Sequence, residues 1–91
     1  MLFRSFSVQA MAGIAVGGDL EAVVEAITAM EEVDYTVVVA GRFDVIVEIV
    51  AEDVEHLITI VGRIRDLPTV SGVELFTYLR LTKQTYNWGT R

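Results

Sequence analysis

Residues 32–50 read EVDYTVVVAGRFDVIVEIV, and this stretch decides the fold. β-Branched residues fill both halves, from Val33 to Ala40 and from Phe43 to Val50, and such residues are enriched in strands. Gly41 interrupts them, and glycine tolerates the backbone angles that turns need. The pattern therefore predicts two antiparallel strands joined by a tight turn.

A helix is predicted on each side of this pair of strands. Asp19 follows Gly17 and Gly18 and is a suitable N-cap for the first helix, which we expect to end near Met30. Asp53 is the corresponding cap of the second helix, and Pro68 ends it. Apolar residues recur at helical spacing after each cap, namely Leu20, Val23, Val24 and Ile27, and then Val54, Leu57, Ile58, Val61 and Ile64.

Two outer strands complete the predicted order βαββαβ. Apolar residues alternate from Ser5 to Val16, and a second such run extends from Val73 to Leu81. The two halves share one pattern of cap, apolar residue, acid, spacer and apolar pair, which indicates a duplicated split βαβ unit. Right-handed crossovers then give a ferredoxin-like α+β fold, with a four-stranded antiparallel sheet and both helices on one face.

The helices leave one face of this sheet uncovered, yet the strands are apolar on both sides. We expect Val33, Tyr35, Val37 and Val39 to share one face of the second strand. In the last strand, Val73, Leu75 and Leu79 oppose Phe76 and Tyr78. An open sheet facing water has polar residues on its free side. The sequence therefore predicts a homodimer in which two sheets pack through their helix-free faces.

Composition narrows the class of protein. The chain has 91 residues, of which 53% are hydrophobic, and this is typical of one globular domain. It has no cysteine, so a disulfide framework and a thiolate metal cluster are excluded. The net charge is -6 and the basic residues are scattered, so we expect no direct binding to nucleic acid. No apolar run approaches the roughly 20 residues of a membrane span, and we expect a cytoplasmic protein.

The sequence predicts no catalytic centre and no metal site. His56 is expected on the outer, solvated side of the second helix, and one histidine defines no metal site. Glu31, Glu32 and Asp34 are interpreted as a solvated acidic corner. A small enzyme would need an acid, a base or a metal set within the sheet, and only Glu48 is available for that hypothesis.

The turn Gly41-Arg42-Phe43-Asp44 has two interpretations. In the structural one, Gly41 supplies a positive φ, the Asp44 carboxylate accepts from turn amides, and Phe43 packs. In the functional one, a small amino acid docks here, with Asp44 meeting its ammonium and backbone N–H groups meeting its carboxylate. The residues alone favour the structural interpretation.

A longer match favours the functional interpretation. The segment from Asp19 to Leu81, with residues 32–50 at its centre and then IRDLP and VELFTYLRL, resembles the effector-sensing and oligomerisation (RAM) domain of the Lrp/AsnC (leucine-responsive/asparagine regulator) family. The residues that match the central block of that family are Val33, Tyr35, Gly41, Phe43 and Asp44. The terminal KQTYNWGT, residues 83–90, resembles the tail of actinobacterial members.

The resemblance implies a non-enzymatic domain of a transcriptional regulator, formed by residues 1–81, with a tail, residues 82–91, that contacts a neighbouring subunit. It implies homodimers through the sheets, an octamer of four dimers, and no cofactor besides an amino-acid effector bound between dimers. In the family, the effector site includes the positions of Gly41 and Asp44, with Arg42 and Phe43 beside them. Phe76 and Tyr78 either line this site or pack in the dimer face.

Two departures from the family affect these expectations. After Pro68 this chain continues Thr69-Val70-Ser71-Gly72-Val73 where the family commonly has Pro-Gly-Val, so we expect a longer or differently shaped loop and an uncertain register for the last strand. The family's regulators also carry an N-terminal helix-turn-helix, and none precedes Met1 here. We therefore expect a stand-alone sensing domain or part of a longer regulator, which associates with itself and with full-length members. The alternative function is a pure oligomerisation module without a ligand.

Overall fold

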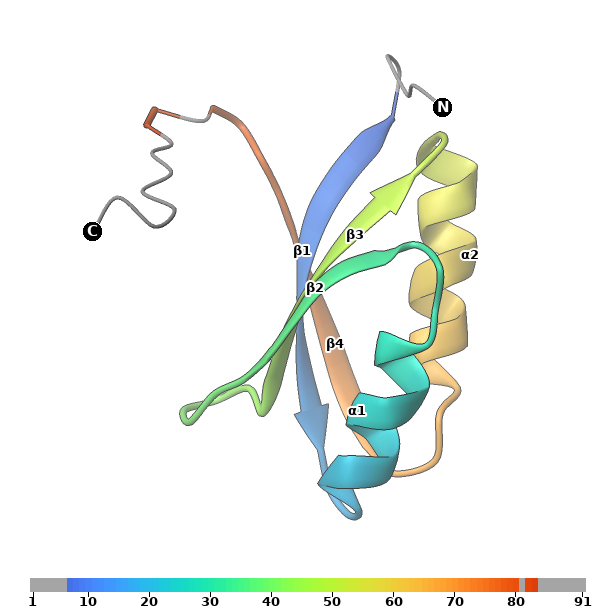
Figure 1. The fold of residues 1–91 in the computed structure, drawn as a ribbon, viewed down its shortest axis with the longest axis vertical. Coiled ribbons are helices and arrows are strands. Elements are labelled where there is room, and N and C mark those ends of the chain that lie inside the picture. The colour runs from blue at the N-terminus through green and yellow to red at the C-terminus, as the bar shows by residue number, and fades with distance from the viewer. Residues whose placement is uncertain (1–6, 81, 84–91) are drawn as a thin grey trace, which may run out of the picture.

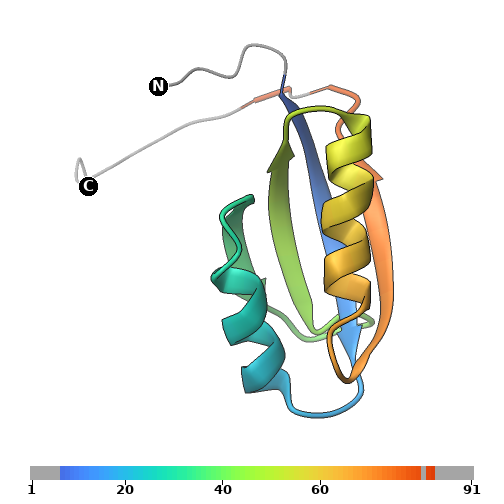
Figure 2. The ribbon, with the colours of Figure 1, turned by 90° about the vertical axis from the view of Figure 1, so that its right-hand side faces the viewer.

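The computed structural model describes residues 7–80 and 82–83, and its elements follow the predicted order. They are β1 (Val8–Val16), α1 (Leu20–Thr28), β2 (Val33–Val38), β3 (Val45–Ala51), α2 (Val54–Arg65) and β4 (Val70–Thr77). The strands form one antiparallel sheet in the order β2-β3-β1-β4. Both helices cover the same face of this sheet (Figures 1 and 2), so the predicted ferredoxin-like α+β fold is confirmed.

Both predicted helix caps are present. The Asp19 carboxylate accepts a hydrogen bond from the Ala22 amide at 3.2 Å, and the Asp53 carboxylate accepts one from the His56 amide at 2.8 Å. Each bond satisfies an amide that has no partner inside its helix. The first helix ends at Thr28, two residues before the predicted end at Met30.

The core lies between the sheet and the helices. Alternate residues of β1 and β3 point toward the helices, because successive side chains of a strand face opposite sides. The buried hydrophobic residues are Ala10, Ala12, Ile14, Val23, Ile27, Val45, Val47, Ile49, Ala51, Leu57, Ile60, Val61 and Ile64. This packed layer closes one face of the sheet, and no helix of the described residues covers the other.

The outer ends of two predicted strands differ from the structure. Ser5 and Phe6 lie outside the described residues, and β1 begins at Val8. In β2, the pairing register shifts between Val33 and Tyr35, so Val33 lies opposite Ile49 while Tyr35 lies opposite Glu48. Val33 therefore packs against the core, and its predicted placement on one face with Tyr35 and Val37 is wrong. A bulge changes the face of every residue beyond it.

The last strand is displaced from the prediction of Val73 to Leu81. β4 begins at Val70 and ends at Thr77, and Leu81 lies outside the described residues. The loop before it is short rather than long, because Thr69 takes a positive φ of 70° and the Thr69 carbonyl accepts from the Gly17 amide at 2.7 Å. This bond brings the loop to the end of β1 and allows Val70 to pair with Val16.

We call the uncovered side of the sheet the helix-free face. Cross-strand partners share a face, so the pairing of Met11 with Glu48 and Phe76, and of Gly13 with Ile46 and Glu74, defines it. It is formed by Gln9, Met11, Gly13, Tyr35, Val37, Ile46, Glu48, Val50, Glu74 and Phe76. It is largely apolar, and it carries two carboxylates.

Candidate functional site

The connection between β2 and β3 is wider than the predicted tight turn. β2 ends at Val38 and β3 begins at Val45, and the Val39 amide donates to the Asp44 carbonyl at 3.0 Å. Gly41 has a φ of +145°, and a Cβ at this position would meet no atom within 4 Å. Glycine is therefore required here for its backbone angle and not for space.

Asp44 connects this turn to β1. Its Oδ2 accepts a hydrogen bond from the Val16 amide at 2.8 Å, and its own amide donates to the Ile14 carbonyl at 2.9 Å. The structural interpretation of the sequence expected the carboxylate to accept from turn amides. Instead it accepts from the last residue of β1, so this half-buried side chain holds the turn in place through its Oδ2.

The Phe43 ring packs against Gly13, where any side chain would collide with it. A Cβ on Gly13 would lie 2.6 Å from the Phe43 ring, closer than any real contact. The same ring lies edge-to-face against Phe76, with centroids 5.9 Å apart and planes at 76°. Phe43, which the sequence predicted either to pack or to lie beside an effector, therefore joins the turn to β1 and β4 on the helix-free face.

Arg42 adds a charged contact from the turn to β4. Its Nη2 lies 2.7 Å from Oε1 of Glu74, and its guanidinium lies 5.0 Å from the centre of the Phe43 ring. Both partners of the ion pair are exposed, so the pair is weak and can be exchanged for another carboxylate.

Tyr78 lies apart from the turn and reaches across β1 to the middle of the helix-free face. Its hydroxyl donates to Oε2 of Glu48 at 2.5 Å. Desolvation, this hydrogen bond and the charge of Glu48 raise the pKa of Tyr78 to about 12. The hydroxyl is thus a proton donor at neutral pH, and Glu48, which the sequence analysis considered for a small enzyme, has a tyrosine as its partner.

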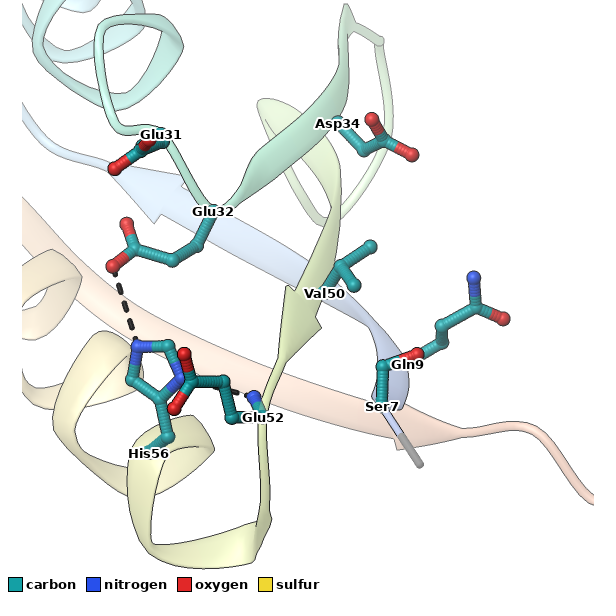
Figure 3. A pocket seen from close by; sticks show the side chains of 8 residues that line it. All are labelled: Ser7, Gln9, Glu31, Glu32, Asp34, Val50, Glu52 and His56. Atoms are coloured by element: carbon teal, nitrogen blue, oxygen red, sulfur yellow. Dashed lines mark hydrogen bonds and ion pairs between the residues drawn. The ribbon is translucent and has the colours of Figure 1, made fainter. Parts of the chain in front are cut away.

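A cavity of about 620 Å³ lies at the opposite corner of the molecule, where the α1–β2 loop meets the start of α2. Figure 3 shows its lining, which includes carboxylates from the loop, from β2 and from the β3–α2 connection. The lining residues are Ser7, Gln9, Glu31, Glu32, Asp34, Val50, Glu52 and His56. None of the six residues predicted to bind an effector lines this cavity.

His56 in this corner is bonded on both ring nitrogens. Nδ1 accepts from the Glu52 amide at 2.9 Å, and Nε2 lies 3.3 Å from Oε2 of Glu32 (Figure 3). The expectation of a simply solvated histidine missed these contacts, because Glu32 lies 24 residues away in the chain. Within the described residues, no group of three or more acidic, histidine or cysteine side chains is arranged to hold a metal ion.

Glu32 also belongs to this network rather than to a solvated corner. Arg63 approaches its Oε2 at 3.2 Å. A backbone hydrogen bond lowers the pKa of Glu32 below its ordinary value, and Arg63 and His56 lower it further, while burial acts in the opposite direction. Glu31 and Asp34 are exposed, as the sequence predicted.

The structure thus brings four of the six predicted residues together and separates the others. Arg42, Phe43 and Phe76 form one cluster with Gly41 beside it, whereas Asp44 points to the end of β1 and Tyr78 to Glu48. Sequence reasoning missed Gly13 and Glu74. The alternation of β1 places Gly13 on the face of the sheet that points away from the core. This alternation was the one signal in the sequence that could have identified Gly13.

The comparisons agree with this architecture. The topology is that of a ferredoxin-like α+β domain, and the sequence model of the Lrp/AsnC ligand binding domain matches residues 9–88. The chain belongs to this family. A search of curated protein sequences found no match.

Solved structures of regulators have the same fold. AsnC of E. coli superimposes with a TM-score of 0.80 at 13% identity, over 89% of this chain and 56% of that protein. The feast or famine regulatory protein of M. tuberculosis, solved with L-methionine, gives 0.73 at 18% identity, over 85% of this chain and 53% of that protein. The chain therefore spans little more than half the length of these two regulators.

A shorter protein matches almost end to end. TTHA0845 of Thermus thermophilus gives a TM-score of 0.77 at 26% identity, over 85% of this chain and 99% of that one. In the described part of this chain, α1 and α2 are separated by strands and form no helix-turn-helix. Neither helix is long and apolar enough to cross a membrane.

Proposed function

We propose that this domain senses a small amino-acid effector for an Lrp/AsnC-type transcriptional regulator, and that the turn from Gly41 to Asp44 binds the effector. The observation that carries the proposal is family membership together with the relative solved with L-methionine. The turn is held in one conformation by Gly13 and the end of β1, and a pre-organised site loses less entropy on binding.

The roles of the residues follow from their contacts. Oδ1 of Asp44 meets the effector's ammonium while Oδ2 keeps the Val16 amide. Backbone N–H groups of the turn meet the carboxylate, and Arg42 and Phe43 flank the effector with Phe76 at its margin. Tyr78 takes the alternative role considered for it, in the dimer face, because its hydroxyl is bonded to Glu48.

The assembly is part of the proposal. Two copies pack through their helix-free faces, because Tyr35, Phe76 and Tyr78 leave 51%, 40% and 46% of their surface exposed on one side of the sheet. Four such dimers form an octamer in the cytoplasm, the effector binds between dimers, and its occupancy shifts the association equilibrium by differential affinity. The domain itself reads no DNA. Residues 84–91 of the tail, proposed to contact a neighbouring subunit, lie outside the described residues.

A second candidate function is oligomerisation without a ligand. The bond from Asp44 to Val16 favours it, because this carboxylate then has a purely structural role.

Calorimetry with the twenty amino acids, paired with sedimentation, tests the proposal. We expect at least one amino acid to bind and to change the association state of the domain. Asp44→Asn keeps an acceptor for Val16 but loses its charge, so it lowers the affinity about tenfold or more, as expected for a charge-assisted hydrogen bond. Asp34→Asn, an exposed carboxylate of β2, is the control and leaves the affinity unchanged.

Two results contradict the proposal in different ways. If no amino acid binds and none changes the assembly, the domain is an oligomerisation module. If Asp44→Asn binds as tightly as the wild type, the effector lies elsewhere.

A further inference from the structure

Glu48 occupies an unusual position for a charged residue. It lies on β3, one of the two central strands, between Tyr35 of β2 and Met11 of β1, and Phe76 follows on β4. Its neighbours in this row are therefore one tyrosine, one methionine and one phenylalanine. A carboxylate in such surroundings is already half-buried in the single chain.

Face-to-face packing of two sheets would place Glu48 near the middle of the contact, where water is excluded. A buried carboxylate is costly unless it is hydrogen-bonded, and removing its partner is then strongly unfavourable. Tyr78 of the same chain supplies such a partner at 2.5 Å. Tyr78 follows directly after the edge strand β4, and its hydroxyl crosses β1 to reach Glu48, so the pair spans the face before any second copy arrives.

We infer that the Glu48–Tyr78 pair within each chain is the polar contact on which the homodimer depends, and that Tyr78 makes dimerisation possible by satisfying a carboxylate which the second copy would otherwise bury without a partner. The occupant of this face is a second copy of the chain. The inference rests on the dimer in the proposed function. It adds that the apolar residues provide the association energy while this pair keeps the carboxylate of Glu48 hydrogen-bonded inside the contact.

The two-fold symmetry of a dimer predicts how substitutions at Glu48 and Tyr78 combine. In a two-fold interface each copy contributes the same patch, so every dimer buries two such pairs. Tyr78→Phe leaves both carboxylates without their partner, whereas Glu48→Gln removes both charges and with them the need for Tyr78. The two substitutions are therefore non-additive, which distinguishes coupling within one pair from two separate contacts.

Sedimentation equilibrium of the full chain tests this, with the dimer dissociation constant as the readout. Tyr78→Phe raises the constant at least tenfold. Glu48→Gln leaves it equal to or below that of the wild type. The double variant Glu48→Gln/Tyr78→Phe stays within about threefold of Glu48→Gln alone, because no charge is left to satisfy.

Two controls match these variants. Tyr35→Phe removes a hydroxyl from the same face, next to Glu48, and changes the constant less than threefold. Glu25→Gln removes the same charge from the exposed side of α1, on the helix-covered side, and has no effect. Circular dichroism shows that each variant keeps the fold.

The possible failures are distinct. A wild type that remains monomeric at 100 µM, a concentration of about 10⁻⁴ M at which even weak specific dimers form, contradicts the proposed dimer and the inference with it. A dimer in which Tyr78→Phe has no effect, or the same effect with and without Glu48, contradicts the inference alone. A Glu48→Gln dimer that is weaker than the wild type also overturns it.

Discussion

On β3, Val45, Val47 and Ile49 face the helices and are fully buried, whereas Ile46, Glu48 and Val50 on the helix-free face are only half-buried. One strand thus takes part in two different surfaces. The helix-covered face has no buried polar or charged residue among those described, and it holds the fold together. The helix-free face mixes apolar residues with Glu48 and Glu74, and these have partners in Tyr78 and Arg42.

The comparison teaches that hydrophobicity alone does not make a core. Both faces of β3 are rich in valine and isoleucine, yet among the described residues only the side that the helices cover is fully buried. The two carboxylates on the other side, Glu48 and Glu74, are tolerated because each has a bonding partner in Tyr78 or Arg42.

The largest expected effect comes from substitutions on β3, which test whether its two faces contribute differently to stability. Ile49→Ala removes a fully buried side chain and lowers the free energy of unfolding by about 2–5 kcal/mol. Ile46→Ala, three residues earlier on the helix-free face, costs less than about 1 kcal/mol in the monomer because the site is already partly open. Urea denaturation at low protein concentration measures both. Equal losses would mean that the helix-free face is part of the folding core.

A smaller effect on stability is expected at Gly13, against which the turn residue Phe43 packs. Gly13→Ala forces the Phe43 ring from its place and costs about 1–3 kcal/mol, as overpacking does. Gly72→Ala is the matched control, because a Cβ there meets no atom within 4 Å, and its cost stays within about 0.5 kcal/mol. Thermal and urea unfolding measure the loss of stability in both variants. If Gly13→Ala is as mild as Gly72→Ala, Phe43 does not depend on this glycine.

The smallest effect concerns Glu32 and depends on pH. Its pKa is lower in the folded chain than its ordinary value of 4.5, so the ionised carboxylate stabilises the fold above that value. This stabilisation is lost as the pH falls through the folded pKa. The difference in unfolding free energy between wild type and Glu32→Gln is within about 1 kcal/mol at pH 5, and it shrinks toward pH 3.

Glu31→Gln serves as the control for this titration, since Glu31 is the exposed neighbour of Glu32. We expect its effect on the unfolding free energy to stay within about 0.5 kcal/mol, as for other exposed substitutions. A Glu32→Gln variant whose difference from wild type does not vary between pH 5 and pH 3 would show that neither the backbone hydrogen bond of Glu32 nor its contacts with Arg63 and His56 lower its pKa.

The fold was predictable because its signals are local. Asp19 and Asp53 mark the helix starts through bonds to amides three residues away. The alternation of β1 and β3 identifies the core face without any knowledge of the partner strands. The errors lie where a local pattern meets a distant constraint. Val33 changes face at a bulge, and β4 starts early because Thr69 bonds to Gly17.

The candidate site was predictable only in part. Gly41 and Asp44 could be identified from the family block, and the positive φ of Gly41 agrees with a turn. The support beneath the turn could not be identified, because Gly13 is 30 residues from Phe43 and Glu74 is 32 residues from Arg42. Nothing in the local sequence indicates which strand will lie under which loop.

By itself, the order of residues determined the elements, the helix caps, the apolar character of both sheet faces and the family, since propensity, capping and alternation act over a few neighbours. Tertiary structure alone decided that Asp44 bonds to Val16, that Phe43 rests on Gly13, that Tyr78 crosses β1 to Glu48, and that Glu32 joins His56 to Arg63. The physical reason is that these contacts depend on which strands the crossovers bring together, and that arrangement results from packing the whole chain around one core.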